Sequence, residues 1–315
     1  MRDALQAALS RLLDREVEIT DPVLLAGGAS KEAWAVDAGG EPLLVRRAAV
    51  GVIHSHTLGL EHELEVLTAA YESGVAVPRP YGYIPDLEGR EALVMERLEG
   101  ETIGRRIVQR PELSRARELL PLQLAEELAR IHAIPPERLP FLRGIGIETL
   151  VADLEGVDEA HPAIELGLAW LRAHPLPDRG RAVAHGDFRL GNVVVGPGGL
   201  RGVLDWEFAH LDAPARDLSW PLVRAWRFGV DERRLGGIGE VEPYLERYNH
   251  LTGRGVTVEE LGWWEVAGNV AWAIGCLTQS RRHLNGQDRS VELAVLGRLA
   301  AEVEYEIVHL LERAA

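Results

Sequence analysis

Two aspartates and one asparagine are spaced so that their side chains could meet at one end of a β-hairpin. Asp187 belongs to a His-Gly-Asp segment, Asn192 follows five positions later, and Asp205 begins an Asp-Trp-Glu segment. The β-branched run after Asn192, a Gly-Pro-Gly-Gly segment and a second apolar run predict a hairpin over residues 192–204. This hairpin would return Asp205 to the side of Asn192. A short strand over residues 181–184 would lead into the loop that carries Asp187.

The chemistry that these residue types could perform is phosphoryl transfer. Carboxylate and amide oxygens are suitable ligands for Mg²⁺, which completes its shell with water and nucleotide phosphates. Gly186 would let the backbone turn tightly, so that the Asp187 carboxylate projects toward a substrate hydroxyl and accepts its proton. Asp, Asn and Gly are also the favoured residues of ordinary turns, so the motif alone leaves open a loop without a catalytic role.

The two motifs resemble those of the aminoglycoside phosphotransferase and choline kinase group, which are small-molecule relatives of protein kinases. Protein kinases have a base Asp, a metal-binding Asn and a second metal-binding Asp at this spacing. The resemblance implies that Asp187 is the catalytic base and that Asn192 and Asp205 are the Mg²⁺ ligands. It also implies that His185 and Asp217 support the site structurally. Asp217 could equally be an acidic residue that caps the N-terminus of a helix.

The short stretch between Asp205 and Asp217 argues against a protein substrate. Protein kinases place a long activation segment after the second metal-binding Asp, and this segment binds the peptide. Only eleven residues, 206–216, occupy that place here. A peptide platform does not fit into this length, so we expect a small hydroxylated molecule as the phosphate acceptor.

The N-terminal part of the chain predicts the nucleotide-binding lobe that such a centre requires. An antiparallel meander of three strands is expected over residues 17–26, 32–37 and 43–47. In its first turn, Gly27 and Gly28 would let the backbone approach phosphate, with Ser30 and Lys31 beside them. A plain hairpin turn is the alternative for this glycine pair.

The third strand lacks the lysine that usually clamps nucleotide phosphates. The only lysine of the chain is Lys31, and arginines stand at the expected clamp position. We assign the clamp to Arg46, because Arg47 points to the other face of a strand, although the choice between the two stays open. By resemblance to the family, Glu63 on a helix over residues 57–71 is the partner of Arg46. A solvated acidic helix face is the alternative for Glu63.

The complete pattern predicts an α+β, bilobal, protein-kinase-like fold. Residues 1–97 would form a small nucleotide-binding N-lobe with an antiparallel sheet and one main helix. Residues 98–315 would form a larger, mostly helical C-lobe with the catalytic loop and the substrate site. The resemblance implies that backbone groups of Glu96 and Leu98, in the hinge between the lobes, bind the base of ATP or GTP.

Apolar periodicity near four predicts the long helices of the C-lobe. They are expected over residues 119–134, 160–173, 213–228, 235–251, 258–284 and 290–311. Six of the eight tryptophans lie between residues 206 and 272, where we expect them to form core or cleft walls. An aromatic stacking wall for the substrate is the alternative.

Composition and net charge indicate which binding partners and which cell compartment to expect. The formal charge of -15 argues against nucleic acid, whose binding depends on Lys and Arg. It suits a cationic acceptor such as an aminoglycoside or choline, although acidic surfaces also serve solubility. Cys276 is the single cysteine and no apolar run approaches membrane-spanning length. A cytoplasmic protein without a membrane partner is therefore expected.

The sequence is interpreted as that of an ATP-dependent, aminoglycoside phosphotransferase-like O-phosphotransferase. Residues 262–266 and 279–284 resemble the branch that includes kinase domains fused to acyl-CoA dehydrogenases, so a hydroxyacyl, choline-like or sugar acceptor rivals an aminoglycoside. A nucleotide-binding module without catalysis belongs to a different class of function. The presence of Asp187, Asn192 and Asp205 argues against that module.

Overall fold

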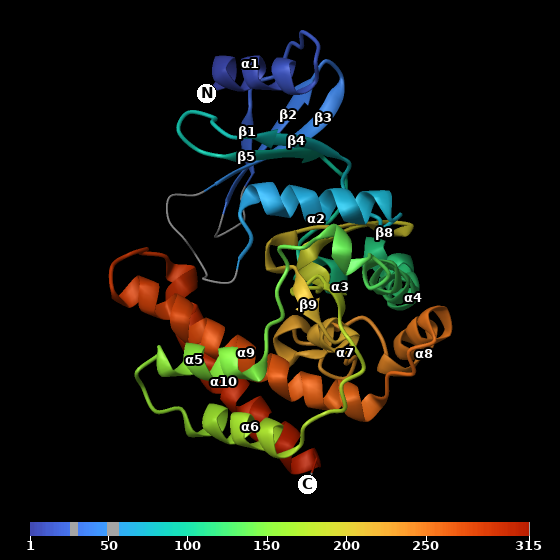
Figure 1. Ribbon diagram of the computed structural model, residues 1–315, viewed down its shortest axis with the longest axis vertical. Helices are drawn as coiled ribbons and strands as arrows, with labels where there is room; N and C mark the ends of the chain where they lie inside the picture. Colours follow the sequence, from blue (N-terminus) through green and yellow to red (C-terminus); the bar gives the residue numbers. More distant parts are fainter. Residues whose placement is uncertain (26–30, 49–56, 315) are drawn as a thin grey trace.

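The computed structural model describes residues 1–25, 31–48 and 57–314 of the chain. Two lobes lie one above the other, with the sheet of the N-terminal lobe at the top and the long helices at the bottom (Figure 1). This arrangement confirms the predicted bilobal α+β fold. None of the helices in the described ranges is long and apolar enough to cross a membrane.

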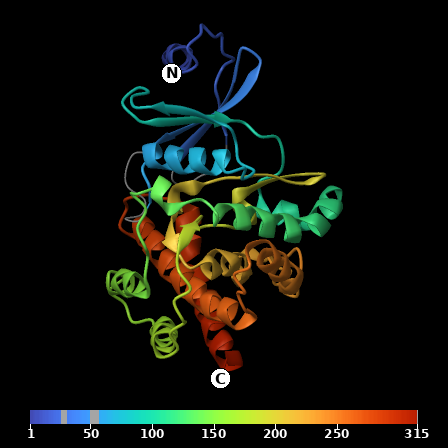
Figure 2. The ribbon, with the colours of Figure 1, turned by 45° about the vertical axis from the view of Figure 1, so that its right-hand side comes forward.

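The N-lobe is built around an antiparallel sheet with the strand order β1-β2-β3-β5-β4. Its strands are β1 (Val23–Leu25), β2 (Lys31–Ala38), β3 (Glu41–Ala48), β4 (Pro80–Ile84) and β5 (Ala92–Glu96). The helix α1 (Arg2–Leu12) lies above the sheet and α2 (Leu60–Glu72) lies below it, between the lobes (Figures 1 and 2). In the β2–β3 pair Ala33 faces Arg46, so the ladder fixes the position of Arg46 in the sheet.

The prediction of one long strand over residues 17–26 is wrong. In the described part of this segment only Val23–Leu25 form a strand, and Ile19 makes an isolated bridge to Ala38. Pro22 stands between the two pieces. Because proline has no N–H to donate to a sheet, it separates them.

Two short antiparallel pairs position the loop that carries Asp187 below the N-lobe. Strand β6 (Ala182–Ala184) pairs with β9 (His210–Asp212), and β7 (Val193–Gly196) pairs with β8 (Gly199–Val203). Between β6 and β7 the chain forms the loop with Asp187 and a 3-10 turn over Leu190–Asn192. The hairpin predicted over residues 192–204 is therefore present.

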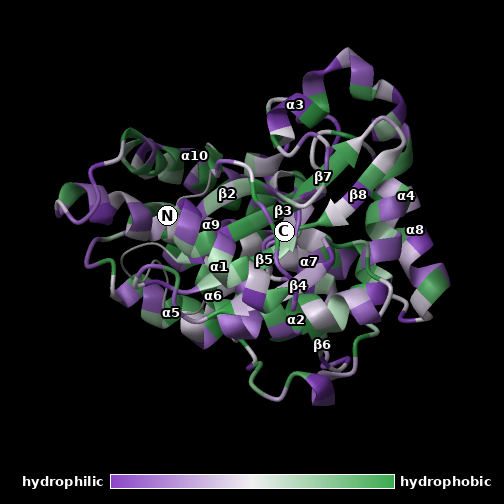
Figure 3. Cartoon of the chain, turned by 90° about the horizontal axis from the view of Figure 1, so that it is seen from above, coloured by the Kyte–Doolittle hydropathy of each residue, from purple (hydrophilic) through white to green (hydrophobic). Residues whose placement is uncertain are grey.

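The C-lobe helices pack around two hydrophobic cores. One core combines α4, α8 and the catalytic hairpins, and the other joins α5, α6, α9 and α10. Figure 3 shows α4 and α8 with both hydrophilic and hydrophobic residues, as expected for helices that bury one face. The helices are α3 (Gly104–Gln109), α4 (Ser114–Ile131), α5 (Ile147–Glu155), α6 (Pro162–Ala173), α7 (Pro214–Ser219), α8 (Val241–Thr252), α9 (Val258–Leu284) and α10 (Val291–Ala314).

Two helix predictions in the C-lobe need correction. The segment 213–228 is not one helix, because α7 ends at Ser219 and two 3-10 turns follow, Trp220–Leu222 and Arg224–Trp226. Pro221 cannot donate the N–H that a continuing α-helix requires. The helix predicted over residues 235–251 begins only at Val241, after a stretch with three glycines at 236, 237 and 239.

Candidate active site

The loop that carries Asp187 is shaped by a glycine in the left-handed region. Gly186 has a φ of +83°, and a Cβ atom on it would lie 2.2 Å from the carbonyl oxygen of Phe208. Any larger residue would collide with the backbone there. This glycine therefore allows the chain to turn directly after β6, into the loop that carries Asp187.

The Asp187 carboxylate is held by three donors. Its Oδ2 accepts a hydrogen bond from Nδ2 of Asn192 at 2.6 Å. Its Oδ1 accepts from the indole Nε1 of Trp220 at 2.7 Å and from Nε of Arg189 at 2.9 Å. The side chain is still 15% exposed, so a substrate hydroxyl can reach it. The contacts orient the carboxylate, as a general base requires.

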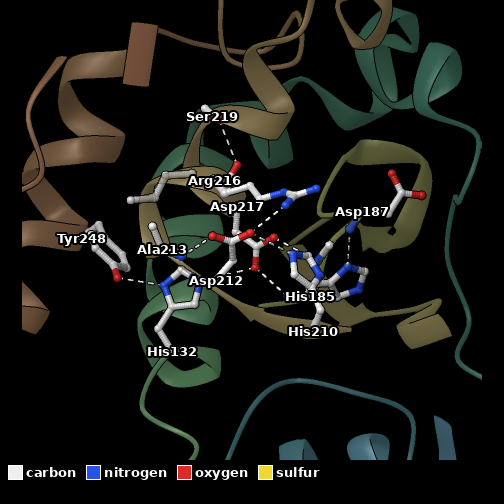
Figure 4. A network of polar contacts seen from close by, with 12 residues as sticks. His132, His185, Asp187, His210, Asp212, Ala213, Arg216, Asp217, Ser219 and Tyr248 are labelled. Carbon is white, nitrogen blue, oxygen red and sulfur yellow. Dashed lines mark hydrogen bonds and ion pairs between the residues drawn. The ribbon is translucent and has the colours of Figure 1, made fainter. Parts of the chain in front are cut away.

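Asp217 braces the catalytic loop from below. Its carboxylate accepts from the backbone N–H of His185 at 2.6 Å and of Gly186 at 2.9 Å. Nε2 of His132 lies 3.3 Å from the same carboxylate, and Nδ1 of His132 contacts the hydroxyl of Tyr248 (Figure 4). Burial would raise the pKa of Asp217, but the contact with His132 and the hydrogen bond from Gly186 lower it to about 2.

His185 connects the catalytic loop to the hairpin that carries Asp205. Its Nδ1 accepts from the backbone N–H of Asp187 at 3.2 Å, so its other nitrogen, Nε2, is the one that donates to the carbonyl of Leu204 at 2.8 Å. The ring also packs at 4.7 Å from that of Trp206. The structure thus places His185 in a position where it fixes the distance between the two aspartates.

Asn192 and Asp205 stand where a cation could be bound. Nδ2 of Asn192 donates to the backbone oxygen and to Oδ2 of Asp187, which leaves its Oδ1 as the atom that could face a metal. Asp205 has a φ of +60°, an uncommon conformation for a residue with a side chain, and its side chain is 41% exposed. Partial desolvation of the carboxylate raises the pKa of Asp205, but the positive charges of Arg46 and Lys31 outweigh this effect and hold the pKa below its ordinary value.

The donor set matches Mg²⁺ better than a transition metal. Asn192 and Asp205 offer amide and carboxylate oxygen, which are hard ligands, and nucleotide phosphates and water usually supply the rest of an Mg²⁺ shell. In the described ranges, no group of three or more His, Cys, Asp or Glu side chains is placed to hold a metal by itself.

The residues predicted to clamp phosphate form one ion-pair network between the lobes. Arg46 contacts the carboxylate of Glu63 through Nη1 and that of Asp205 through Nη2, the latter at 2.6 Å. Lys31 bridges Glu63 at 2.6 Å and Glu207 at 2.7 Å. Burial would lower the pKa of Arg46, but the carboxylates of Asp205 and Glu63 raise it above its ordinary value, so the guanidinium remains charged.

The other residues that were predicted to bind the nucleotide are not among the described residues of this network. Gly27, Gly28 and Ser30 lie outside the described residues. Arg47 points away from the network, toward the carbonyl of Glu88. The remaining two predicted residues, Glu96 and Leu98, lie at the end of β5 and two positions beyond it. The N–H of Glu96 already donates to the carbonyl of Arg79 at 2.9 Å, so this N–H is not available to a nucleotide base.

Three residues of the site were not singled out from the sequence. Arg189 and Trp220 both touch Asp187, and Glu207 pairs with the only lysine. The position of Arg189, two residues after the candidate base, was a usable signal. Trp220 gave no comparable signal, because only the folded chain brings it beside Asp187.

Sequence comparison places the chain among phosphotransferases. The profile described as Phosphotransferase enzyme family matches residues 22–259. Acyl-CoA dehydrogenase family member 11 of Pongo abelii is 29% identical over 266 residues, which cover 76% of this chain and 33% of that protein. The same protein of Homo sapiens is 30% identical over 224 residues, which cover 65% of this chain and 28% of the relative. The chain thus spans about a third of the length of the curated relatives it matches.

Solved structures with the same fold cover nearly the whole chain. A Ralstonia eutropha protein, provisionally assigned as an aminoglycoside phosphotransferase, has a TM-score of 0.78 at 19% identity, over 99% of this chain and 98% of that one. The GDP complex of aminoglycoside 2'-phosphotransferase-IIIa has a TM-score of 0.68 at 15% identity, over 97% and 98%. These identities support the fold alone. Because the family profile covers most of the chain, including every described residue of the site, this protein belongs to the phosphotransferase enzyme family.

Proposed function

We propose that the chain transfers the γ-phosphoryl group of ATP, or of GTP, to a hydroxyl group of a small molecule. The observation that carries this proposal is the joined arrangement at the lobe interface. The Asp187 carboxylate accepts a hydrogen bond from Asn192, and Arg46 bridges Glu63 on α2 to Asp205. The two groups are joined by the N–H of Leu204, next to Asp205, which donates to the carbonyl of Asn192 at 2.8 Å. A base, two oxygen ligands and a charged phosphate clamp thus stand together, as phosphoryl transfer requires.

Each residue has a distinct role in this proposal. Asp187 orients the acceptor hydroxyl and takes its proton. Asn192 and Asp205 would hold Mg²⁺, which when bound supplies positive charge against the nucleotide phosphates. Arg46 and Lys31 contact those phosphates, and Glu63 keeps both cations in place.

The rest of the nucleotide site follows the family resemblance. The loop with Gly27, Gly28 and Ser30 would approach the phosphates through its backbone. The carbonyl of Glu96 and the backbone of Leu98 would contact the base. We also propose that the division between the nucleotide-binding lobe and the helical lobe falls between residues 97 and 98, and that the protein acts in the cytoplasm, where its buried single cysteine, Cys276, suits a reducing medium.

Two groups of acceptors are candidates. Solved structures of the fold include complexes with kanamycin and hygromycin B, which favours an aminoglycoside-like polyhydroxylated molecule. The curated sequence relatives are acyl-CoA dehydrogenase family members, which favours a hydroxyacyl acceptor. Choline-like molecules and sugars complete the second group.

The test is ATP turnover with Mg²⁺ across a panel of aminoglycosides, choline, sugars and hydroxyacyl thioesters. We expect acceptor-dependent formation of ADP and a phosphorylated product with one class of the panel. If Mg-ATP binds tightly but no acceptor is phosphorylated, the chain is instead a nucleotide-binding module without catalysis. GTP in place of ATP in the same assay decides which nucleotide is preferred.

A further inference from the structure

The side of Asp187 that faces away from Asn192 carries a positive charge. Oδ2 of Asp187 is bonded to Asn192, whereas Oδ1 is bonded to Arg189 and Trp220. Nucleotide and metal belong to the Asn192 side under the proposed function. Arg189 lies directly beside the carboxylate, where it can reach groups of an acceptor whose hydroxyl is hydrogen-bonded to Asp187.

Arg189 is held in place by aromatic packing. The centre of its guanidinium lies 4.6 Å above the ring of Trp226, a cation–π arrangement that fixes the plane of the group. Trp226 is buried and packs at 5.7 Å from Trp220 and at 4.7 Å from Trp272. The next residue, Arg227, ties this segment to α9 by an ion pair of 2.7 Å with Glu265. The support beneath Arg189 is thus a packed wall.

The guanidinium of Arg189 has N–H groups that can still donate hydrogen bonds to a ligand. Its Nε is bonded to Asp187, and the side chain is 26% exposed. Among the described residues, none accepts a hydrogen bond from its two terminal nitrogens. Gly191 makes room for the group, since a Cβ atom on this residue would lie 2.0 Å from Nη1 of Arg189. A planar guanidinium with two free N–H₂ groups matches a carboxylate or a phosphate in both charge and geometry.

We propose that Arg189, supported on Trp226, forms an anion-binding subsite for the acceptor, so that the preferred acceptor carries a carboxylate or phosphate group close to its reacting hydroxyl. This inference rests on the proposed transfer at Asp187, and it names the acceptor class that transfer would use. The reason is proximity. A hydroxyl within hydrogen-bond distance of the Asp187 carboxylate brings neighbouring groups of the acceptor within reach of the Arg189 terminal nitrogens. An anionic group there would gain a charge-assisted, bidentate contact, whereas a cationic group would be repelled.

The test compares matched acceptors that differ only in the anionic group. The carboxylate arm sets 3-hydroxybutyrate against 1,3-butanediol, and the phosphate arm sets glycerol 3-phosphate against glycerol. We expect wild-type kcat/KM to be higher for the anionic member of at least one pair, and the pair that responds identifies the anion. Preference for the neutral member in both pairs, or for choline over all of them, would overturn the inference.

Three variants separate the subsite from a general effect on catalysis. Arg189→Met should lower kcat/KM for the anionic acceptor on the order of ten- to hundredfold more than for its neutral partner, with the KM for ATP nearly unchanged. Gly191→Ala keeps the charge but displaces the guanidinium. It should therefore also lower kcat/KM for the anionic acceptor more than for its neutral partner. Arg115→Met removes an exposed arginine of α4 and is the matched control. It should change neither the kcat/KM for the two acceptors nor the KM for ATP. Equal losses for both members of a pair in Arg189→Met, which a contact with the γ-phosphate would produce, would contradict the subsite.

A chain that phosphorylates none of these acceptors would refute the proposed transfer but would still test the subsite. In that case, protein with bound Mg-ADP is titrated with glycerol 3-phosphate and with 3-hydroxybutyrate while tryptophan fluorescence is recorded. A saturable change that Arg189→Met abolishes would support the subsite independently of turnover. No change, or the same change in Arg189→Met, would overturn it.

Discussion

The phosphate clamp that we propose for this chain is an arginine, where protein kinases use a lysine. Arg46 reaches two carboxylates at once, Glu63 on α2 and Asp205 at the end of the catalytic hairpin. An ammonium group is a compact point charge, whereas a guanidinium presents several donors in one plane and can serve two partners. Lys31 on the neighbouring strand adds a second cation through Glu63 and Glu207.

Replacing Arg46 should weaken nucleotide binding. For Arg46→Met we predict a loss of Mg-ATP affinity on the order of tenfold or more. The reason is that the variant lacks the buried, charged guanidinium that would donate hydrogen bonds to the phosphates. Titration calorimetry with Mg-ATP measures this. Arg47→Met is the matched control, since Arg47 lies on the other face of β3 and should leave affinity nearly intact. A larger loss in Arg47→Met than in Arg46→Met would reverse the assignment.

At the scale of elements, the catalytic loop depends on α7 more than on its own strand. Strand β6 is only three residues long, and the N–H groups just after it are bonded to Asp217 in the first turn of α7. Pro214 and Pro221 keep α7 short, so that its first turn and Trp220 both reach the loop. A continuous helix over residues 213–228 would not have produced this arrangement.

Because Asp217 holds the loop through its ionised carboxylate, the stability of the protein should fall at acid pH. The pKa of Asp217 is about 2 in the folded protein, below its ordinary value of 3.8, so its contribution to stability is full above about pH 4 and is lost as the pH falls toward 2. Asp217→Asn should therefore cost about 2 kcal/mol of unfolding free energy at pH 7. Urea unfolding of wild type and variant at pH 7 and pH 3 should show a smaller gap at pH 3. A gap that widens in acid would contradict this account.

Sequence periodicity predicted some elements well because their signals are local. The helix over Val258–Leu284 was predicted with the observed bounds, and the β7–β8 hairpin follows from β-branched residues and a Gly-Pro turn. Elements that tertiary packing decides were not found. The helices α3 and α5 are short, and residues 213–228 are apolar enough to resemble one helix despite Pro221.

In the candidate site, too, the residues that belong to a local motif could be predicted and those brought together by tertiary packing could not. Asp187, Asn192 and Asp205 lie within 19 consecutive positions, so their spacing could be recognised in the sequence. In the structure Asn192 donates to Asp187, and Leu204, next to Asp205, donates its N–H to the carbonyl of Asn192. The contact of Trp220 with Asp187 joins residues 33 positions apart, and that of Lys31 with Glu207 joins residues 176 apart. No local pattern predicts such pairs, because they depend on how the two lobes meet.

At the scale of the whole molecule, α2 belongs structurally to both lobes. Its buried residues Leu60 and Leu67 share a hydrophobic core with the C-lobe, and His62 stacks on Phe141 at 4.1 Å. Glu63, on the same helix, holds both cations of the clamp. The position of α2 against the C-lobe thus helps to place Arg46, which contacts both Glu63 and Asp205.

Because the phosphate site draws on both lobes, nucleotide and metal together should stabilise the molecule. Mg-AMP-PNP at about 100 times its Kd should add about 2.7 kcal/mol to the free energy of unfolding, which raises Tm by several degrees. Differential scanning calorimetry measures the shift. Removing Mg²⁺ with EDTA should abolish most of it, since Asn192 and Asp205 then have no cation to share with the phosphates. An equal shift with and without the metal would count against the proposed ligands.

Under the proposed function, Asp187 is the base of a phosphoryl transfer. The most direct measurement is the rate of product formation by Asp187→Ala with the acceptor found in the panel, together with Mg-ATP affinity by calorimetry. We expect the rate to fall by a factor on the order of 10²–10⁴ while the affinity for Mg-ATP stays close to that of the wild type. A variant that retains the rate, or that loses rate and nucleotide affinity in equal measure, would contradict the account.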